Sequence, residues 1–240
     1  MKGIILAGGT GSRLYPITKV TNKCLLPVGK EPMIFRMLDI FKKSNIEDIM
    51  LITGPDHMGD VISLLGSGSE HGCSLTYRVQ DEANGIAAAL KMCASFAKGE
   101  KFAVILGDNI FGDNSEVAQG IKLFDMMSED YRLFSKTVLD PHRFGVPVLD
   151  ASGNVIDIIE KPKLPPSNKA IVGLYCYTDE VFGVIDTLQP SARGEYEISE
   201  LNSWLVRNRH GSLVDVQCEW IDAGTHNSYR RANEMVWSSP

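Results

Sequence analysis

The segment Gly8–Arg13 reads Gly-Gly-Thr-Gly-Ser-Arg and follows a short apolar stretch, Gly3–Ala7, with the composition of a buried strand. Three glycines in four positions let the backbone turn sharply and leave its N–H groups uncovered by any Cβ. Successive amide dipoles that point into one concavity stabilise an anion. Arg13 and Lys23 add two positive charges just downstream. This pattern predicts a loop that wraps the phosphates of a nucleotide.

Other glycine-loop motifs fit these residues less well. A Walker A loop ends in Gly-Lys-Ser/Thr, whereas Ser12 and Arg13 follow the last glycine here. The dinucleotide fingerprint has a third glycine where this chain has Leu14, and Pro16 disfavours a helix directly after the loop. A kinase glycine loop would need a catalytic-loop signature downstream, which the sequence lacks. A plain glycine-rich turn remains an alternative for the loop taken alone. Lys23, fixed in an apolar stretch that ends in proline, favours the functional interpretation.

The stretch Lys2–Leu14, with Lys23-x-Leu25-Leu26-Pro27, resembles the signature of the sugar-phosphate nucleotidyltransferases, and most closely the branch that joins dTTP to glucose 1-phosphate. Matching segments continue in order almost to the end of the chain: Leu106–Asn109, Glu160–Pro162, Gly173–Tyr175, Pro190–Glu195 and Asp222–His226. The resemblance implies an α/β, Rossmann-like nucleotidyltransferase (GT-A-like) fold. In that fold a mixed, mostly parallel central sheet carries helices on both faces.

Composition excludes several classes of protein. The 240 residues carry a formal net charge of −6, which argues against a general nucleic-acid binder. A polyphosphate site would then be a local cationic island helped by a metal. Five cysteines without a Cys-x-x-Cys spacing indicate reduced thiols in a cytoplasm rather than a zinc site. The sequence also has no signal-peptide pattern and no apolar run of membrane-spanning length, so we expect a cytoplasmic protein without a membrane partner.

Hydrophobic periodicity predicts strands alternating with helices in the first half and several successive strands in the second. The expected strands are 3–7, 48–53, 75–79, 102–106, 133–138, 145–149, 155–159, 170–177 and 213–218. Five expected helices span 56–65 (with Asp56 as cap), 85–98, 115–127, 179–188 and 197–208. Two more helices are expected to begin at Pro32 and near residue 225. We expect one domain, 1–240, with a mainly nucleotide-binding half (1–110) and a mainly sugar-phosphate-binding half (111–240).

The resemblance assigns residues to three groups. The nucleotide-binding group is Leu6, Gly8, Gly9, Gly11, Arg13, Lys23, Gln80, Gly85 and Asp108. The sugar-binding group is Asn109, Gly145, Glu160, Lys161, Val172 and Tyr175, with Ile171 as an alternative to Val172. The catalytic group is Arg13, Lys23, Asp108, Lys161 and Asp222, of which Asp108 and Asp222 would hold Mg²⁺.

Residue chemistry alone leaves these roles open. Asp108 ends an apolar strand, where ligands of open α/β sheets bind, but a Gly-Asp-Asn is also a common turn or helix cap. Lys161 alone would be taken for a solvated surface lysine and Tyr175 for a core tyrosine. The resemblance implies that the phosphate of glucose 1-phosphate attacks the α-phosphorus of dTTP in line and releases pyrophosphate. That attacking group is already an anion, so no general base is needed, and among the histidines only His226 is expected to support Asp222.

The chain departs from the family pattern at the base-binding side. Relatives commonly carry Leu-Ala-Gln-Ala where this sequence has Ile86–Ala89, while Cys24 replaces a polar residue and Ser199-Glu200 replaces Thr-Asp. A uridylyl- or cytidylyltransferase that uses another sugar 1-phosphate is therefore the alternative activity. A non-catalytic nucleotide-sugar sensor is a further alternative. The resemblance also implies a homo-oligomer, a tetramer or dimer.

Overall fold

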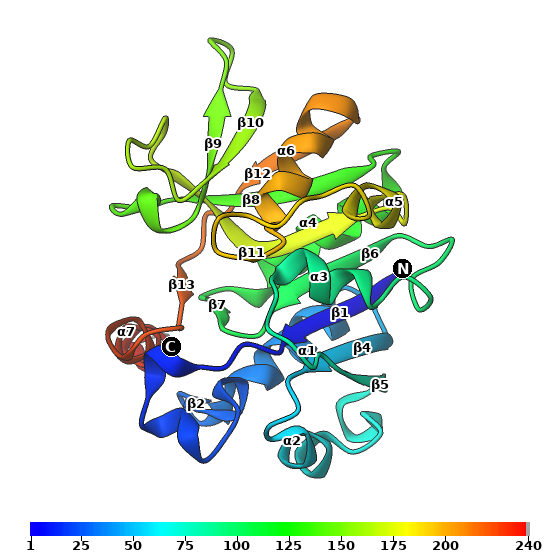
Figure 1. Cartoon of the computed structure of the whole chain (residues 1–240). Helices are drawn as coiled ribbons and strands as arrows, with labels where there is room; N and C mark the ends of the chain where they lie inside the picture. Colours follow the sequence, from blue (N-terminus) through cyan, green and yellow to red (C-terminus); the bar gives the residue numbers. More distant parts are fainter. Residues whose placement is uncertain (239–240) are drawn as a thin grey trace.

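A seven-stranded sheet forms the centre of the computed structural model, which describes residues 1–238 (Figure 1). Its strands, in spatial order, are β12 (Gly211–Asp215), β8 (Tyr131–Thr137), β11 (Lys169–Tyr177), β6 (Phe102–Leu106), β1 (Lys2–Ala7), β4 (Asp48–Thr53) and β5 (Ser74–Val79). β11 runs antiparallel to both of its neighbours, and the other four pairings are parallel. The predicted mixed, mostly parallel sheet is confirmed.

Helices cover both faces of the sheet because its strands alternate apolar side chains to either side. One core contains α1 (Met33–Lys43), α2 (Met58–Leu65), α4 (Asn114–Met126) and part of α7 (His226–Ser238). The other contains α3 (Ile86–Lys91), α5 (Val181–Ile185) and α6 (Ile198–Asn208). Every helix among residues 1–238 falls short of the length and apolar character that a bilayer span requires.

Two short hairpins lie beside the central sheet. β9 (Gly145–Leu149) and β10 (Val155–Glu160), both expected strands, form one hairpin, and the carboxylate of Asp150 caps its turn by accepting from the backbone N–H groups of Ser152 and Asn154. β2 (Pro27–Val28) pairs with β3 (Glu31–Pro32) directly after the turn that contains Lys23. This second hairpin was not predicted.

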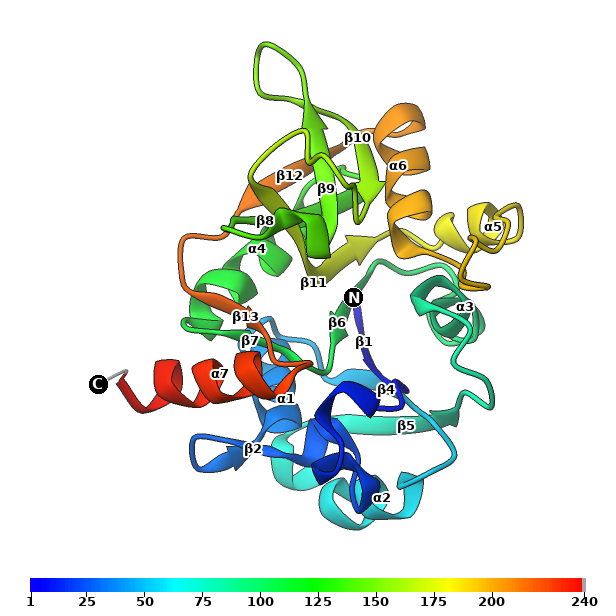
Figure 2. The same ribbon diagram turned by 60° about the vertical axis from the view of Figure 1, so that its left-hand side comes forward.

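The pairing that matters most for the site was also not predicted. β7 (Asn109–Phe111) lies antiparallel to β13 (Trp220–Asp222), and both views show them together at the edge of the sheet next to α7 (Figures 1 and 2). The register places Asp222 opposite Asn109, and the N–H of Ala223 donates to the carbonyl of Asp108 at 2.8 Å. Two acidic residues more than a hundred positions apart in sequence therefore become neighbours.

Several predicted element ends are wrong. Pro32 precedes α1 instead of opening it, and α2 begins after His57, in the left-handed region at φ 65°, without a cap from Asp56. α3 ends at Lys91, after which i→i−3 hydrogen bonds replace the helical pattern predicted to residue 98. β12 covers 211–215 instead of 213–218.

Candidate active site

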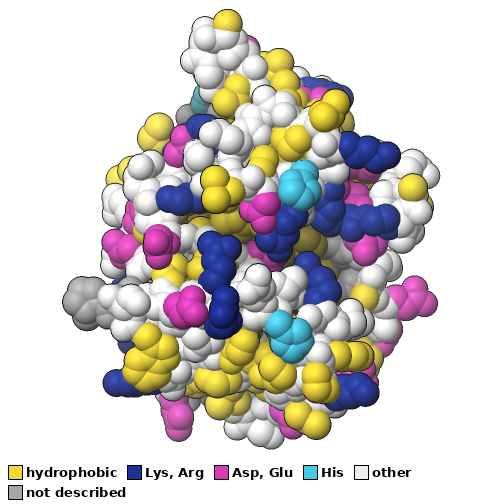
Figure 3. All heavy atoms as spheres, turned by 90° about the vertical axis from the view of Figure 1, so that its left-hand side faces the viewer, with side chains coloured by type: hydrophobic (Ala, Val, Ile, Leu, Met, Phe, Trp, Pro, Cys, Tyr) yellow, Lys and Arg dark blue, Asp and Glu magenta, His cyan; other side chains and the backbone are white. Residues whose placement is uncertain are grey.

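A cavity of about 400 Å³ opens beyond the carboxyl ends of β1 and β6. In the space-filling view, lysine and arginine side chains gather around a hollow in this face (Figure 3). The predicted site residues that line the cavity are Leu6, Gly8, Gly9, Arg13, Lys23, Gln80, Gly85, Asp108, Asn109, Gly145, Glu160, Lys161, Tyr175 and Asp222. Segments from all parts of the sequence thus meet in one cavity.

Two predicted residues do not line it. The side chain of Val172 is fully buried in the core on the α1 and α4 side of the sheet, because it alternates with Ile171, which does line the cavity. Ile171, the alternative, is thus the better placed of the two. Gly11 is not among the residues that line the cavity, although it lies in the loop beside them. Its backbone is in the left-handed region at φ 64°, and its carbonyl accepts a hydrogen bond from Thr18 at 2.7 Å.

Asn22 fixes the glycine loop and the turn that carries Lys23 relative to each other. Its side-chain amide donates to the carbonyl of Ala7, at the end of β1, at 3.0 Å. Its side-chain oxygen accepts from the N–H of Cys24 at 2.9 Å and so caps the single 3₁₀ turn Lys23–Leu25. The ammonium of Lys23 consequently lies beside Gly9, where a Cβ would be 3.4 Å from its Nζ.

Lys23 and Asp108 form a buried ion pair at the floor of the cavity. Burial by itself would raise the pKa of Asp108, but the Lys23 ammonium and hydrogen bonds from Lys23 and Asn109 outweigh it, so the pKa lies below its ordinary value. Burial likewise opposes the charge on Lys23, yet the Asp108 carboxylate holds the pKa of Lys23 above its ordinary value. Both groups therefore stay charged.

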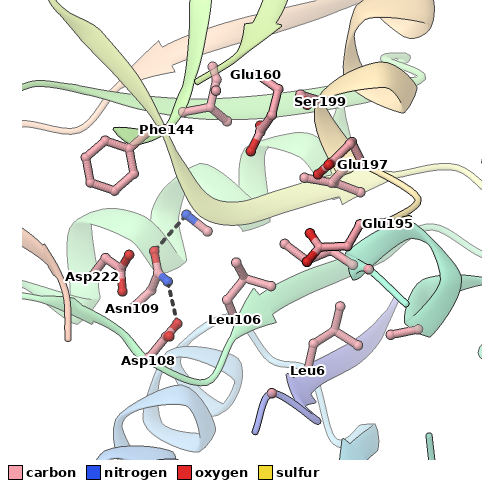
Figure 4. Close-up of a pocket in the computed structure, with 18 of the residues that line it drawn as sticks. Leu6, Leu106, Asp108, Asn109, Phe144, Glu160, Glu195, Glu197, Ser199 and Asp222 are labelled. Carbon is pink, nitrogen blue, oxygen red and sulfur yellow. Dashed lines mark hydrogen bonds between the residues drawn. The ribbon is translucent and has the colours of Figure 1, made fainter. Parts of the chain in front are cut away.

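Asn109 orients Asp108. Its side-chain oxygen accepts from the N–H of Gly173 at 2.7 Å and from Nε1 of Trp220 at 2.8 Å, while its Nδ2 donates to Oδ1 of Asp108 at 3.0 Å. Figure 4 shows two of these bonds, with Asp108 and Asp222 on the same side of the cavity. Since the Asn109 side chain is engaged by protein atoms, we infer that it holds Asp108, and its role as a sugar ligand stays a prediction.

Asp222 has the opposite electrostatic character. Burial raises its pKa, and the neighbouring Asp108 carboxylate raises it further, against the weaker attraction of Lys23 and Arg13. Its Oδ1 accepts from the N–H of Gly224 at 2.9 Å. Nη2 of Arg13 lies 2.7 Å from the point that a Gly224 Cβ would occupy, so the guanidinium packs over this backbone turn.

His226 does not support Asp222, contrary to the prediction. Its Nε2 lies 2.7 Å from the carbonyl oxygen of Tyr15. The histidine thus contacts the segment that follows Arg13 rather than the acidic pair.

The two carboxylates fit a divalent cation of the magnesium type. Within residues 1–238, no group of three or more His, Cys, Asp and Glu side chains converges in a metal-binding arrangement. Zinc sites require such a set, whereas Mg²⁺ is commonly held by one or two carboxylates with water and substrate phosphates. A cation between Asp108 and Asp222 would also relieve the repulsion that raises the pKa of Asp222.

Gln80 lines the cavity beside the glycine loop. Its Oε1 packs against Gly8, where a Cβ would be only 2.8 Å away. Its Nε2 donates to Oδ1 of Asn84 at 3.0 Å, which fixes the orientation of the amide. Ala83 and Ile86 supply apolar surface beside it. One amide that offers an acceptor and a donor over an apolar wall suits the edge of a pyrimidine.

The sugar end is built around the end of β10. Lys161 adopts φ 41°, a conformation uncommon for a non-glycine residue, and its Nζ lies 3.0 Å from Oε1 of Glu160. Gly145 faces the same space, and a Cβ there would lie 3.7 Å from Oε2 of Glu160, in ordinary van der Waals contact. Tyr175 is buried behind these residues, and burial raises the pKa of its hydroxyl, which stays neutral.

Sequence reasoning gave no role to Arg193, although it recognised the segment Pro190–Glu195. Nη2 of Arg193 lies 3.4 Å from Glu160, 3.3 Å from Glu195 and 2.8 Å from Glu197. It also missed Ser199, a buried residue at the cavity wall whose hydroxyl has no hydrogen-bond partner within the described part of the chain. For Arg193, the one signal available in the sequence was its place in the recognised segment Pro190–Glu195.

The cavity is not the cationic island that net charge led us to expect. Its cationic side chains are Arg13, Lys23, Arg143, Lys161 and Arg193, and its acidic ones are Asp108, Glu160, Glu195, Glu197 and Asp222. Five charges of each sign balance, so anionic substrates would bind there only with a cation or by displacing carboxylates from their basic partners.

Comparison with known proteins agrees with this geometry. The chain matches the nucleotidyl transferase family model over residues 2–239. It is 39% identical over 237 residues to the glucose-1-phosphate thymidylyltransferase of Xanthomonas campestris pv. campestris strain B100, covering 98% of this chain and 80% of that one. The enzyme of the same name from Neisseria meningitidis is 40% identical over 241 residues, with coverage of 98% and 82%.

Solved structures point the same way. A Bacillus anthracis protein assigned as a glucose-1-phosphate thymidylyltransferase, crystallised with sucrose, superposes with a TM-score of 0.93 at 50% identity, covering 99% of this chain and 96% of that one. A UDP-glucose pyrophosphorylase complexed with UDP-glucose shares the fold, with a TM-score of 0.88 at 22% identity and coverage of 100% and 99%. The chain belongs to the nucleotidyl transferase family and is an enzyme of that class.

Proposed function

We propose that this enzyme transfers a thymidylyl group from dTTP to glucose 1-phosphate, giving dTDP-glucose and pyrophosphate. The observation that carries the proposal is that two separate basic groups line one cavity together with an acidic pair. Arg13 and Lys23 lie at the glycine loop, and Lys161 and Arg193 lie at the sugar end of the same cavity. Two phosphate-bearing substrates can therefore approach each other across Asp108.

The loop end would hold the nucleotide. Backbone N–H groups of Gly8 and Gly9 would face the triphosphate, and the guanidinium of Arg13 would grip the departing pyrophosphate with its fork of donors. The ammonium of Lys23, which is paired with Asp108 in the free protein, would then also contact the phosphates. Gln80 would read the edge of the base.

The sugar end would hold the attacking phosphate. Lys161 and Arg193 are bound to carboxylates of Glu160, Glu195 and Glu197 in the free protein, and a sugar phosphate would replace part of that partner set. Glu160 would then accept hydrogen bonds from sugar hydroxyls. The attacking phosphate is already an anion, so the site needs to position and neutralise charge rather than remove a proton.

Asp108 and Asp222 would hold Mg²⁺, which, when bound, neutralises charge on the nucleotide phosphates. Asn109 keeps the Asp108 carboxylate turned toward the cavity, and the N–H of Gly224 keeps that of Asp222 in place. Both carboxylates are thus preorganised before any ligand arrives.

The test is pyrophosphate release from a matrix of nucleoside triphosphates (dTTP, UTP, CTP) and sugar 1-phosphates with Mg²⁺. The proposal predicts the highest kcat/KM with dTTP and glucose 1-phosphate, and loss of activity with EDTA that Mg²⁺ restores. A clear preference for CTP or for another sugar phosphate would replace the substrate assignment. Binding without any pyrophosphate release would support the sensor alternative instead.

A further inference from the structure

One face of α7 contacts the main chain of the segment that carries Arg13 and Lys23. His226, Tyr229 and Asn233 are spaced three and four residues apart, so they project from the same side of the helix. Figures 1 and 2 both show α7 beside β13, and it packs against β2, which directly follows the Lys23 turn. This face has no role in the substrate contacts proposed above.

Each of the three side chains bonds a different backbone group of that segment. Nε2 of His226 lies 2.7 Å from the Tyr15 carbonyl oxygen and must carry the proton, because a carbonyl only accepts. The Tyr229 hydroxyl donates to the carbonyl of Pro27 at 2.6 Å. The remaining contact is made by Oδ1 of Asn233, which accepts from the N–H of Gly29 at 3.0 Å.

Close packing reinforces the third bond. Gly29 has φ 72°, and a Cβ on it would lie 2.6 Å from Cγ1 of Val236, the next residue along this face of the helix. One bond follows each cation closely in the sequence: Tyr15 is two residues beyond Arg13, and Pro27 is four beyond Lys23.

The start of α7 is itself fixed to the acidic pair. Oγ1 of Thr225 accepts from the N–H of Ser228 at 3.2 Å, and the two hydroxyls lie 2.8 Å apart, which defines the first turn of the helix. Gly224, directly before this cap, donates to Asp222 and lies under the guanidinium of Arg13. A chain of hydrogen bonds and backbone thus links the Asp222 carboxylate through the helix to the segment 15–29.

We propose that α7 fixes the position of the triphosphate-binding segment, a role that we call the splint. His226 and Tyr229 are its positioning residues and hold Arg13 and Lys23 in place relative to Asp222. The inference rests on the proposed function, since it assigns the loop end to the nucleotide. The sugar end is built from β10, β11 and the segment before α6, which lie apart from α7 in both views (Figures 1 and 2). Weakening the splint should therefore raise the KM for dTTP and pyrophosphate and leave that for glucose 1-phosphate unchanged.

The first test compares three variants. His226→Phe keeps a ring but removes the donor, and we expect the KM for dTTP to rise about threefold to tenfold, the range of one lost hydrogen bond. His226→Gln keeps a donor near the position of Nε2 and should restore a near-normal KM. Arg230→Gln is the matched control, because Arg230 is exposed and its partners within residues 1–238 are Asn227 and Glu234 on its own helix.

The second test asks whether His226 acts through Arg13. Binding of dTTP with Mg²⁺ is measured by calorimetry for His226→Phe, Arg13→Gln and the double variant. If the double variant loses about as much dTTP affinity as Arg13→Gln alone, the result supports the splint. Additive losses, equal rises in both substrate KM values, or failure of His226→Gln to restore binding would overturn it. Should His226→Phe not fold, Tyr229→Phe carries the same test at the Lys23 side.

The two proposals can fail separately. If wild-type protein binds dTTP but releases no pyrophosphate, the proposed function is wrong, and the binding series still decides on the splint. If wild-type protein is active and none of the α7 variants changes the KM for dTTP, the proposed function stands and the splint is wrong.

Discussion

The two ends of the cavity hold their charges differently. At the acidic end, Lys23 and Asp108 are buried and keep one geometry, with 14% and 8% of their side chains exposed. At the end predicted to hold the sugar, the side chains of Lys161 and Arg193 are 45% and 44% exposed and share the carboxylate of Glu160. Buried charges are preorganised and weakly screened, whereas exposed ones exchange partners at little cost. Under the proposed function, we therefore expect the acidic end to set the rate and the sugar end to set the affinity for the second substrate.

The largest expected effect is on turnover at the acidic end. Asp108→Asn should lower kcat by about two to four orders of magnitude, about 3 to 5 kcal/mol of transition-state stabilisation, because one carboxylate of the acidic pair is lost. Pyrophosphate release measures the change, with circular dichroism as a check on folding and Asp125→Asn, on the exposed side of α4, as the control. Near-normal turnover would remove Asp108 from the mechanism.

At the sugar end we expect an effect on KM. Lys161→Gln should raise the KM for glucose 1-phosphate about tenfold to hundredfold, the range of a lost charged hydrogen bond, with a smaller change in kcat. Because Lys161 is half-exposed, the wild-type KM should also rise with ionic strength. Initial rates at several salt concentrations measure both, and Lys163→Gln, exposed two residues along, is the control. A loss confined to kcat would contradict the comparison.

The two carboxylates should respond oppositely in the metal-free protein. Asp222→Asn should raise Tm by about 2 to 4 °C for each kcal/mol of repulsion relieved, and Asp108→Asn should lower it because Lys23 loses its buried partner. Since the pKa of Asp222 is raised on folding, its contribution to stability falls as pH rises through that pKa. The advantage of Asp222→Asn should therefore appear at neutral pH and vanish in acid, where the wild-type carboxyl is protonated in both states. Thermal unfolding in EDTA at two pH values measures this, and equal shifts for both variants would contradict it.

The smallest expected effect concerns the base. Thymine differs from uracil by one methyl group, about 0.8 kcal/mol when buried, so kcat/KM for dTTP should exceed that for UTP by only about fourfold through this contact. Ala83 and Ile86 are the apolar side chains available to it near Gln80. Side-by-side kinetics decide, and a ratio in the hundreds would require discrimination at the ribose.

Local patterns in the sequence were enough to predict the central strands. The expected bounds of β4 and β6 in the main sheet, and of β9 in the hairpin, agree with the structure. The expected bounds of the other strands of the main sheet, apart from β12, differ from the structure by one or two residues. Apolar runs bounded by turn residues carry this information because each buried strand is specified by its own residues. The end of α3 could not be read in this way, since the alanine-rich pattern continues past the point where the backbone tightens.

The site itself depends on pairings between distant segments. β7 and β13 have three residues each, too short for any periodicity, yet their register brings Asp222 to Asp108. Arg193 reaches Glu160, and His226 reaches Tyr15, on a distant segment of the chain, so neither of these two contacts has a local signal. Family resemblance identified the residues, and only the three-dimensional arrangement distinguishes Asn109 as an orienting group and Val172 as core.

The central claim is that Asp108 and Asp222 hold one cation opposite the basic glycine loop. Anomalous diffraction from crystals grown with Mn²⁺ and dTTP tests it most directly. We predict a single strong peak within coordination distance, about 2.2 Å, of a carboxylate oxygen of each aspartate and next to the nucleotide phosphates. A peak that contacts neither aspartate, or Arg13 and Lys23 turned away from the bound triphosphate, would contradict the account.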